Sequence, residues 1–279
     1  MNELKSDSKQ NEKNHGTVIA TYKTIEDDPN HYVATNSNDL PWDNEKPQIK
    51  RVEIGSEMQP TDTRLWFAHI NGLEYGDFTN LNTSNVIDMH SMFLQDEISR
   101  NSAKTFELKG LNNWNTSKVK NMCGMFANCG KWASKWEIGN LSSWDTKNVT
   151  DMNSMFYDAG CNAKTFNLRG LDNWNTQNVT NMSYMFEGAG QNASMWSIGD
   201  LSKWKTNNVI DMTRMFANPC EKISNWSVGN LTKWNVDKVQ KPELGMQMST
   251  HPFFHHESYQ YQPNWKFEWP KQNGRPGIQ

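Results

Sequence analysis

The sequence predicts a repeat solenoid in which each coil of roughly 30 residues pairs a short parallel β-strand with a short helical turn. Three observations predict it. A tryptophan recurs every 30 residues, a phenylalanine recurs with the same period, and each unit carries a short apolar–polar–apolar segment close to a glycine. A unit of this size cannot bury its apolar side alone, so successive units must stack. The two aromatic columns are Trp114, Trp144, Trp174, Trp204 and Trp234, and Phe126, Phe156, Phe186 and Phe216.

The helical turn is predicted from the spacing of methionine and phenylalanine. Met122, Met125 and Phe126 follow the i, i+3, i+4 pattern that places side chains on one side of a helix, and Val119 precedes them on the same side. The polar residues before Val119 are suited to capping a helix start. We therefore expect a short helix or helical turn at 119–126, 149–156, 179–186 and 209–216.

The strand is predicted from the other half of each unit. Apolar and polar residues alternate at 106–108, 136–138, 166–168, 196–198 and 226–228, and a glycine follows each segment within two residues. Successive coils would align these segments into a parallel sheet that rises by roughly 4.8 Å per strand.

A longer period overlies the first. The units that begin at Phe106 and Phe166 share one pattern, and the units that begin at Trp136 and Trp196 share another, which indicates a period of 60. The last unit, 226–234, breaks this alternation. Phenylalanine and tryptophan alternating in one column would interdigitate without clashes or voids.

The chain divides into four predicted regions. A degenerate unit at Leu81 lies 33 residues before the next unit and marks the start of the repeats. Before it, strand-like segments at 17–22 and 49–54 indicate a β-rich cap over the first coil. Prolines and aromatic residues after 239 indicate a second cap. The regions are 1–16, a disordered lead; 17–80, the N-terminal β-rich cap; 81–239, the solenoid repeats; and 240–279, an aromatic C-terminal cap or tail.

Composition excludes some functions. The net charge of −3 gives no electrostatic reason to expect nucleic acid as a partner. No stretch reaches the roughly 18 apolar residues of a membrane span, and the first residues lack the apolar segment of a signal peptide. Two localisations stay open: extracellular or cell-surface if an export signal has been removed, and cytoplasmic if Met1 is the native start.

The repeated phrase Thr-x-x-Val-x-(Asp/Asn)-Met-x-x-Met-Phe, found five times within 81–239, resembles the BspA-type leucine-rich repeats of bacterial surface proteins and lipoproteins. The resemblance implies a leucine-rich-repeat-like solenoid on an extracellular, surface-attached protein that serves adhesion or the binding of a host or partner molecule without catalysis. The chain departs from this family in two ways. Its 30-residue units are longer than the common form, and no anchor motif is visible at either end.

Candidates for chemistry are few, and no catalytic residue, metal ligand or cofactor is predicted. The four cysteines show no CxxC pairing; we favour buried thiols over a disulfide, a metal site or a nucleophile. His251 and His255 have a spacing that could hold zinc on a helix, but Pro252 between them favours a solvated tail. The cysteines are Cys123, Cys129, Cys161 and Cys220.

Asparagine and aspartate share one column, immediately before the first methionine of each motif. A calcium ion needs roughly six to eight oxygens, so one carboxylate in every second coil is sparse. We expect these side chains to bond neighbouring backbone between coils instead. The column comprises Asn121, Asp151, Asn181 and Asp211.

Binding is the better functional class, because a solenoid presents a long regular surface on a rigid scaffold. The predicted partner is a protein or glycan on a host or neighbouring cell surface. A glycan-binding adhesin that uses exposed tryptophan and an intracellular assembly protein are the alternatives, and plain solvation explains any single polar residue. The candidate binding residues are Lys109, Lys118, Lys147, Arg169, Gln177, Lys203, Lys205 and Arg214.

Overall fold

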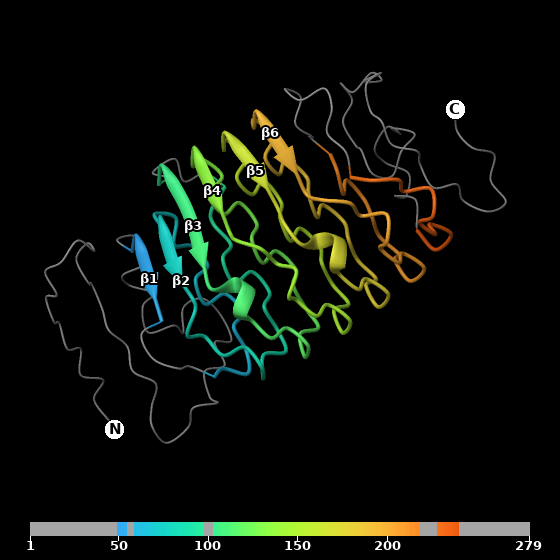
Figure 1. The fold of residues 1–279 in the computed structure, drawn as a ribbon, viewed down its shortest axis with the longest axis horizontal. Helices are drawn as coiled ribbons and strands as arrows, with labels where there is room; N and C mark the ends of the chain where they lie inside the picture. The colour runs from blue at the N-terminus through green and yellow to red at the C-terminus, as the bar shows by residue number, and fades with distance from the viewer. Residues whose placement is uncertain (1–48, 55–58, 98–102, 218–227, 240–279) are drawn as a thin grey trace, which may run out of the picture.

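The chain folds as a parallel β-solenoid in which successive coils stack along one axis (Figure 1). The computed structural model describes residues 49–54, 59–97, 103–217 and 228–239. The repeat architecture predicted from the sequence is confirmed. The predictions for the lead, the strand at 17–22, Cys220, the histidines of the tail and the C-terminal cap lie outside the described residues.

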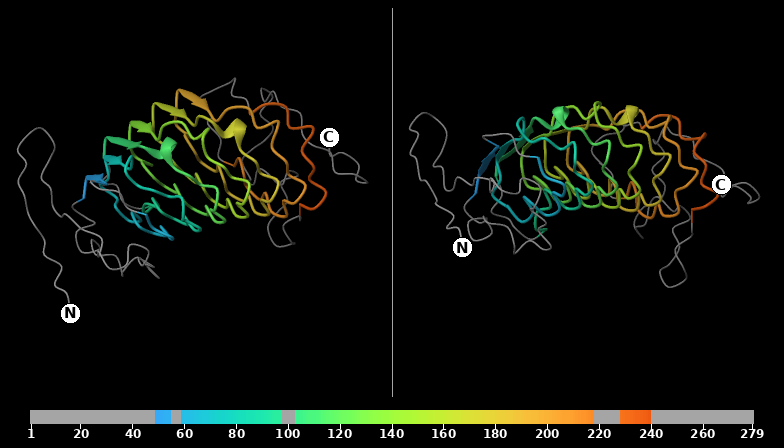
Figure 2. Two further views of the ribbon diagram at one scale, coloured as in Figure 1. Left: turned by 60° about the horizontal axis from the view of Figure 1, so that its bottom comes forward. Right: turned by 90° about the horizontal axis from the view of Figure 1, so that it is seen from below.

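The coils from β1 to β6 each contribute one short strand to the same edge of the solenoid (Figure 2). Four strands form a parallel sheet in chain order, and two more pair beside them. Phe106 is the register partner of Trp136, and Phe166 that of Trp196, as the alternation predicts. The strands are β1 (Arg51–Glu53), β2 (Tyr75–Asp77), β3 (Thr105–Lys109), β4 (Lys135–Glu137), β5 (Thr165–Asn167) and β6 (Met195–Ser197).

The sheet begins before the first repeat recognised in the sequence. Strand β1 pairs with β2 and β2 pairs with β3, both in parallel, and Asp62 forms a bridge with Asp88 in the next coil. Phe67 stacks on Phe93 at a centroid distance of 5.5 Å. Residues 62–67 are therefore a degenerate copy of the repeat, with Trp66-Phe67 in the place of Met-Phe.

The prediction of a short helix or helical turn at 119–126 and at the equivalent positions of the other coils is wrong. Met125 N–H donates to Met122 O, but Gly124 N–H and Phe126 N–H donate to Asn153 O and Met155 O of the next coil, at 2.8 and 2.9 Å. The φ of the residue at this position is positive in every unit, 62° at Gly124 and 56° at Arg214, which ends any helical path. A three-residue turn therefore reproduces the inward i, i+3, i+4 spacing, and coil-to-coil hydrogen bonds replace those of a helix.

Short 3₁₀ helices occur elsewhere and explain the period of 60. The elements η3 (Leu111–Asn113) and η4 (Leu171–Asn173) each follow a glycine with positive φ. The coils that alternate with these two have an Asx turn at the same position. In one of them, Asn140 Oδ1 accepts from Ser142 N–H at 2.9 Å. Glycine is required at 170, because a Cβ there would lie 2.2 Å from the Ser142 nitrogen of the preceding coil.

The core consists of stacked columns of identical side chains. Trp144 and Trp174 lie parallel within 2° at a centroid distance of 6.0 Å, and Phe126 and Phe156 within 3° at 5.4 Å. Four of the column tryptophans donate their Nε1–H to a leucine carbonyl of the preceding coil, as in Trp144 to Leu111 O at 2.8 Å, and Trp114 donates to Phe78 O. All five column tryptophans are at most 3% exposed. Stacking thus buries the aromatic columns of the repeats.

Buried threonines join the coils next to the tryptophan column. Thr146 is fully buried, and its Oγ1–H donates to Asn175 O of the next coil at 3.1 Å. The residue before it, Asp145, accepts from Lys147 N–H and so caps a turn, where the sequence predicted a helix cap. Polar side chains of the repeat therefore satisfy backbone groups that the turns leave open.

Candidate binding surfaces

The outward residues of the strands form an open surface, called here the strand face. Because side chains alternate along a strand, Phe106 and Leu108 of β3 are buried while Glu107 and Lys109 point outward. The inward columns repeat from coil to coil, whereas the outward positions differ in charge and size. The strand face comprises Arg51, Glu53, Tyr75, Asp77, Thr105, Glu107, Lys109, Lys135, Glu137, Thr165, Asn167, Arg169, Met195 and Ser197.

Ion pairs cover the part of the strand face that lies over β3 and β4. Glu107 and Glu137 are register partners, an arrangement that brings like charges together. Lys135 Nζ lies 2.9 Å from Glu107 Oε2, and Arg169 Nη2 lies 2.8 Å from Glu137 Oε1. The hydrogen bond from Lys135 holds the pKa of Glu107 below its usual value. These cations offset the repulsion between the two glutamates.

Tyr75 is the aromatic centre of the strand face. The Arg51 guanidinium lies 4.2 Å from its ring centroid, and Lys109 Nζ lies 5.0 Å from it. The phenol O–H donates to Asp77 Oδ2 at 3.3 Å. A ring held between two cations combines apolar area with charge, as protein-binding surfaces do.

The strand face becomes uncharged over β5 and β6. Thr165, Asn167 and Ser197 are exposed, and Met195 is 63% exposed. A methionine this open is a flexible apolar contact available to a partner. The strand face thus joins a charged region to a neutral region with an apolar centre.

Most of the predicted binding residues lie on a second surface, called here the loop edge. It consists of the turns around the tryptophan column at 112–118, 142–148, 172–178, 202–208 and 232–238. Lys118 Nζ bonds Asn85 Oδ1 at 2.7 Å, and Lys147 Nζ pairs with Asp145 at 2.8 Å. The predicted residues on this edge, all exposed, are Lys118, Lys147, Gln177, Lys203 and Lys205.

The structure does not bring all eight predicted residues together. Lys109 and Arg169 lie on the strand face. Arg214 lies away from both surfaces, on the turn that follows Asp211, and pairs with Glu187, whose side chain is 4% exposed. The hydrogen bond that Arg214 donates to Glu187 raises the pKa of Arg214. Arg214 therefore serves a structural ion pair, with Arg214 Nε 2.8 Å from Glu187 Oε2.

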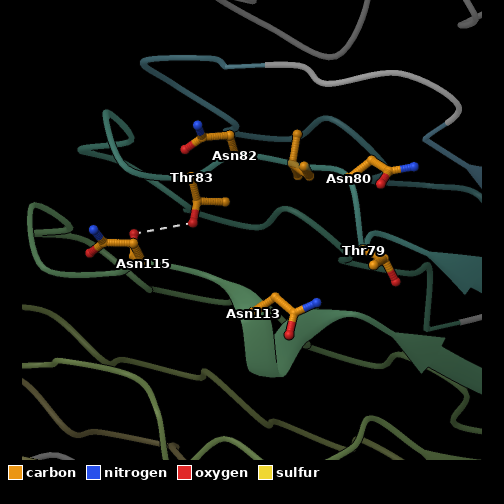
Figure 3. A pocket seen from close by; sticks show the side chains of 7 residues that line it. Thr79, Asn80, Asn82, Thr83, Asn113 and Asn115 are labelled. Carbon is orange, nitrogen blue, oxygen red and sulfur yellow. Dashed lines mark hydrogen bonds between the residues drawn. The ribbon is translucent and has the colours of Figure 1, made fainter.

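A hollow of about 360 Å³ opens where the first coils depart from the repeat (Figure 3). Leu81 stands in it where later coils carry tryptophan, and a smaller side chain leaves the space open. Thr83 Oγ1–H bonds Asn115 O at 3.1 Å across one side. The hollow carries no charge, and Asn82 and Asn115 already cap turns. Its lining is Thr79, Asn80, Leu81, Asn82, Thr83, Asn113 and Asn115.

The asparagine and aspartate column is structural, but not in the way the sequence predicted. Each Oδ1 accepts from the N–H two residues ahead in its own coil, as in Asp151 from Asn153 at 2.8 Å. The expected bonding to backbone between coils is therefore wrong for these oxygens. Among the described residues, no group of three His, Cys, Asp or Glu is placed to hold a metal ion.

The described cysteines are free thiols in environments that suppress ionisation. Burial raises the pKa of Cys123 and of Cys161 to about 11, and it raises the pKa of the fully buried Cys129 further. A nucleophilic cysteine needs the opposite shift. Cys129 behaves as a small apolar group of the core, whereas the thiols of Cys123 and Cys161 also donate weak hydrogen bonds to Asn153 and Gln191.

Two overlapping stretches, residues 61–189 and 132–251, match the family described as "Mycoplasma protein of unknown function, DUF285". Together they cover more than half of the chain. The chain belongs to this family. No curated protein and no solved structure matches it. The first matched stretch of this Mycoplasma family member begins at 61, one residue before the degenerate coil at Asp62.

Sequence reasoning missed several strand-face residues of this DUF285 protein. Arg51 and Tyr75 fall in the region predicted to be a cap, Glu107 and Glu137 are the polar positions of the predicted strands 106–108 and 136–138, and Met195 lies just before the predicted strand 196–198. The sequence signal that could have identified these residues is the alternation along each strand, which places them on its outward side. No helix among the described residues is long and apolar enough to cross a membrane.

Proposed function

We propose that this protein is a non-catalytic interaction module of the cell surface, which binds a host or partner protein through the strand face. The observation that carries the proposal is the contrast between inward columns that repeat and outward strand positions that change from coil to coil. A rigid scaffold with a variable outer surface suits recognition of a large partner.

The composition of the strand face supports a protein partner. It combines an aromatic ring bracketed by cations, paired charges and an exposed methionine, and aromatic residues, arginine and methionine are enriched at protein interfaces. The surface location rests on the resemblance of the repeats to BspA-type surface proteins. The absence of a catalytic role rests on the raised pKa values of the thiols and on the structural use of the other polar columns.

A charge swap across one ion pair tests the strand face. Glu137→Arg reverses one charge, Arg169→Glu reverses the other, and the double variant restores the pair with opposite polarity. Binding of the full chain to immobilised extracellular-matrix proteins and to intact cells is measured for all four proteins. We expect the double variant to match the parent in melting temperature but to lose binding. Full binding by the double variant would refute the strand face as the contact surface.

A glycan-binding role is the second candidate, and it depends on Trp132. This ring is 38% exposed, unlike the column tryptophans, and Lys131 Nζ lies 5.9 Å from its centroid. Asn162 and Asn192 occupy the same position in the next two coils and are joined by a hydrogen bond of 3.0 Å. A glycan array with Trp132→Ala as the comparison separates the two functions, because this variant should leave protein binding unchanged.

A further inference from the structure

The loop edge changes character along the solenoid. Its first coils carry mainly asparagine and serine, whereas the last two described coils carry four exposed lysines: Lys203, Lys205, Lys233 and Lys238. Lys203 and Lys233 each directly precede a tryptophan, and these two rings stack at 6.2 Å. The two lysines therefore lie side by side in adjacent coils, where like charges repel.

Lys205 replaces the Asn or Asp that the other coils carry at its position. At its position they carry Asn82, Asn115, Asp145, Asn175 and Asn235, and each Oδ1 accepts a hydrogen bond from the N–H two residues ahead. Lysine has no acceptor, so this turn lacks its cap. Lysine at this position therefore removes the hydrogen bond that caps the turn and adds a positive charge beside Lys203. A departure of this kind at an exposed position points to function.

No described carboxylate within ion-pairing distance neutralises Lys203, Lys205 or Lys233. Asp200 is the acid nearest to Lys203 and Lys205 in their coil, and it accepts from Ser202 N–H at 2.9 Å to cap its own turn. The hydrogen bonds from Ser202 and the charge of Lys203 together lower the pKa of Asp200, and Asp237 is the acid in the coil of Lys233. Lys238 Nζ bonds the neutral Asn208 at 2.9 Å. The ammonium groups of Lys203, Lys205 and Lys233 are thus available to an external anion.

We propose that the loop edge of the last two described coils binds a linear anionic polysaccharide. Successive coils are spaced by roughly 4.8 Å, so lysines in neighbouring coils present charge at intervals along a line, as a linear polyanion does. Exposed amides of Gln177 and Asn207 lie on the same edge, and amides can both donate to and accept from sugar hydroxyls.

Other polyanions fit this surface less well. Single-stranded nucleic acids are held by exposed aromatic rings on which bases stack, but Trp204 and Trp234 are 3% and 2% exposed. This inference is independent of the proposed role of the strand face, which concerns a different surface and a protein partner.

The test replaces each lysine by the residue that other coils carry at the same position. The variant Lys203→Asn, Lys205→Asn, Lys233→Asn is compared with a control in the earlier coils, Lys118→Asn, Lys120→Thr, Lys147→Asn, which removes equal charge. Binding of the full chain to immobilised heparin is measured at several salt concentrations. We expect the first variant to lose affinity at least tenfold and the control to lose less than twofold.

Stability provides an independent readout. Because Lys205→Asn restores the missing cap, the first variant should melt at the same temperature as the parent or higher, so lost binding would not reflect unfolding. Equal loss in both variants, or no binding of the parent to heparin, would overturn the proposal. Equally tight binding to polyglutamate or to DNA would overturn the assignment to a polysaccharide.

Discussion

Trp174 shows how much one residue contributes to the stack. Its ring lies 6.0 Å from that of Trp144 and 6.2 Å from that of Trp204, and its Nε1–H donates to Leu141 O. Trp174→Ala should lower the free energy of unfolding by about 3–5 kcal/mol, because it leaves a cavity between two rings. Equilibrium denaturation measures the change. Trp132→Ala is the matched control, and an equal loss in both variants would contradict the stacked core.

The thiols give a prediction about alkaline pH. Unfolded cysteines ionise near pH 8.5, while Cys161 in the folded chain has a pKa of about 11. The unfolded state therefore loses its proton first. The free energy of unfolding should fall as pH rises from about 9 to 11, by on the order of 1 kcal/mol per pH unit for this buried thiol.

Urea denaturation at constant ionic strength checks this dependence at pH 8, 9 and 10. The Cys161→Ala variant should show a shallower decline than the parent, because one of the linked groups is gone. A parallel pH dependence in the two proteins would show that Cys161 ionises equally well in the folded and unfolded states.

At the scale of the element, glycines fix where the turns approach the strands. A Cβ at Gly190 would lie 2.4 Å from Phe166 Cβ, and its φ is 60°. Gly139 also has positive φ, 81°, but a Cβ there meets nothing within 4 Å. Placing alanine at positive φ should destabilise both variants by roughly 1 kcal/mol, and only Gly190→Ala adds a clash with the core.

Thermal unfolding should therefore separate the two glycine variants. We expect Gly139→Ala to lower the melting temperature slightly and Gly190→Ala to lower it by clearly more. Equal shifts would mean that the turn at 190 does not pack against the strand column.

The elements also show what the sequence could and could not predict. The strands and the aromatic columns followed from alternation and period, because burial repeats with the coil. The turns at 119–126 did not, because a three-residue turn and a helix place Met122, Met125 and Phe126 on the same side. Strand β2 escaped notice because Gly76 occupies its inward position, where a side chain would meet Phe78 and Leu108.

The binding surfaces were predicted in part. Exposure of Lys203 and Lys205 followed from their place beside a buried tryptophan, but the pairing of Arg214 with Glu187 did not, because 27 residues separate them and only the stacking brings them together. Contacts between neighbouring coils depend on small differences in coil length, which a period of 30 conceals.

At the scale of the whole molecule, stability is a sum over coils and the contacts between neighbours. The alternation of η3 and η4 coils with Asx-turn coils makes the pair of coils, 60 residues, the structural unit. In one strand column Trp136 and Phe166 lie at 4.8 Å, and Trp196 follows at 6.3 Å. Removing one coil breaks this alternation, and removing two preserves it.

Two internal deletions test the unit directly. Deleting 121–180 joins Lys120 to Asn181 and places Trp196 next to Phe106, as Trp136 stands in the parent. Deleting 121–150 instead places Phe166 next to Phe106, so that two coils with 3₁₀ helices become neighbours. The larger tryptophan ring that separates the two phenylalanines in the parent is then missing from the column. The shorter protein should therefore have the higher melting temperature, although it retains one coil fewer. A higher melting temperature for the 30-residue deletion would show that each coil is an independent unit.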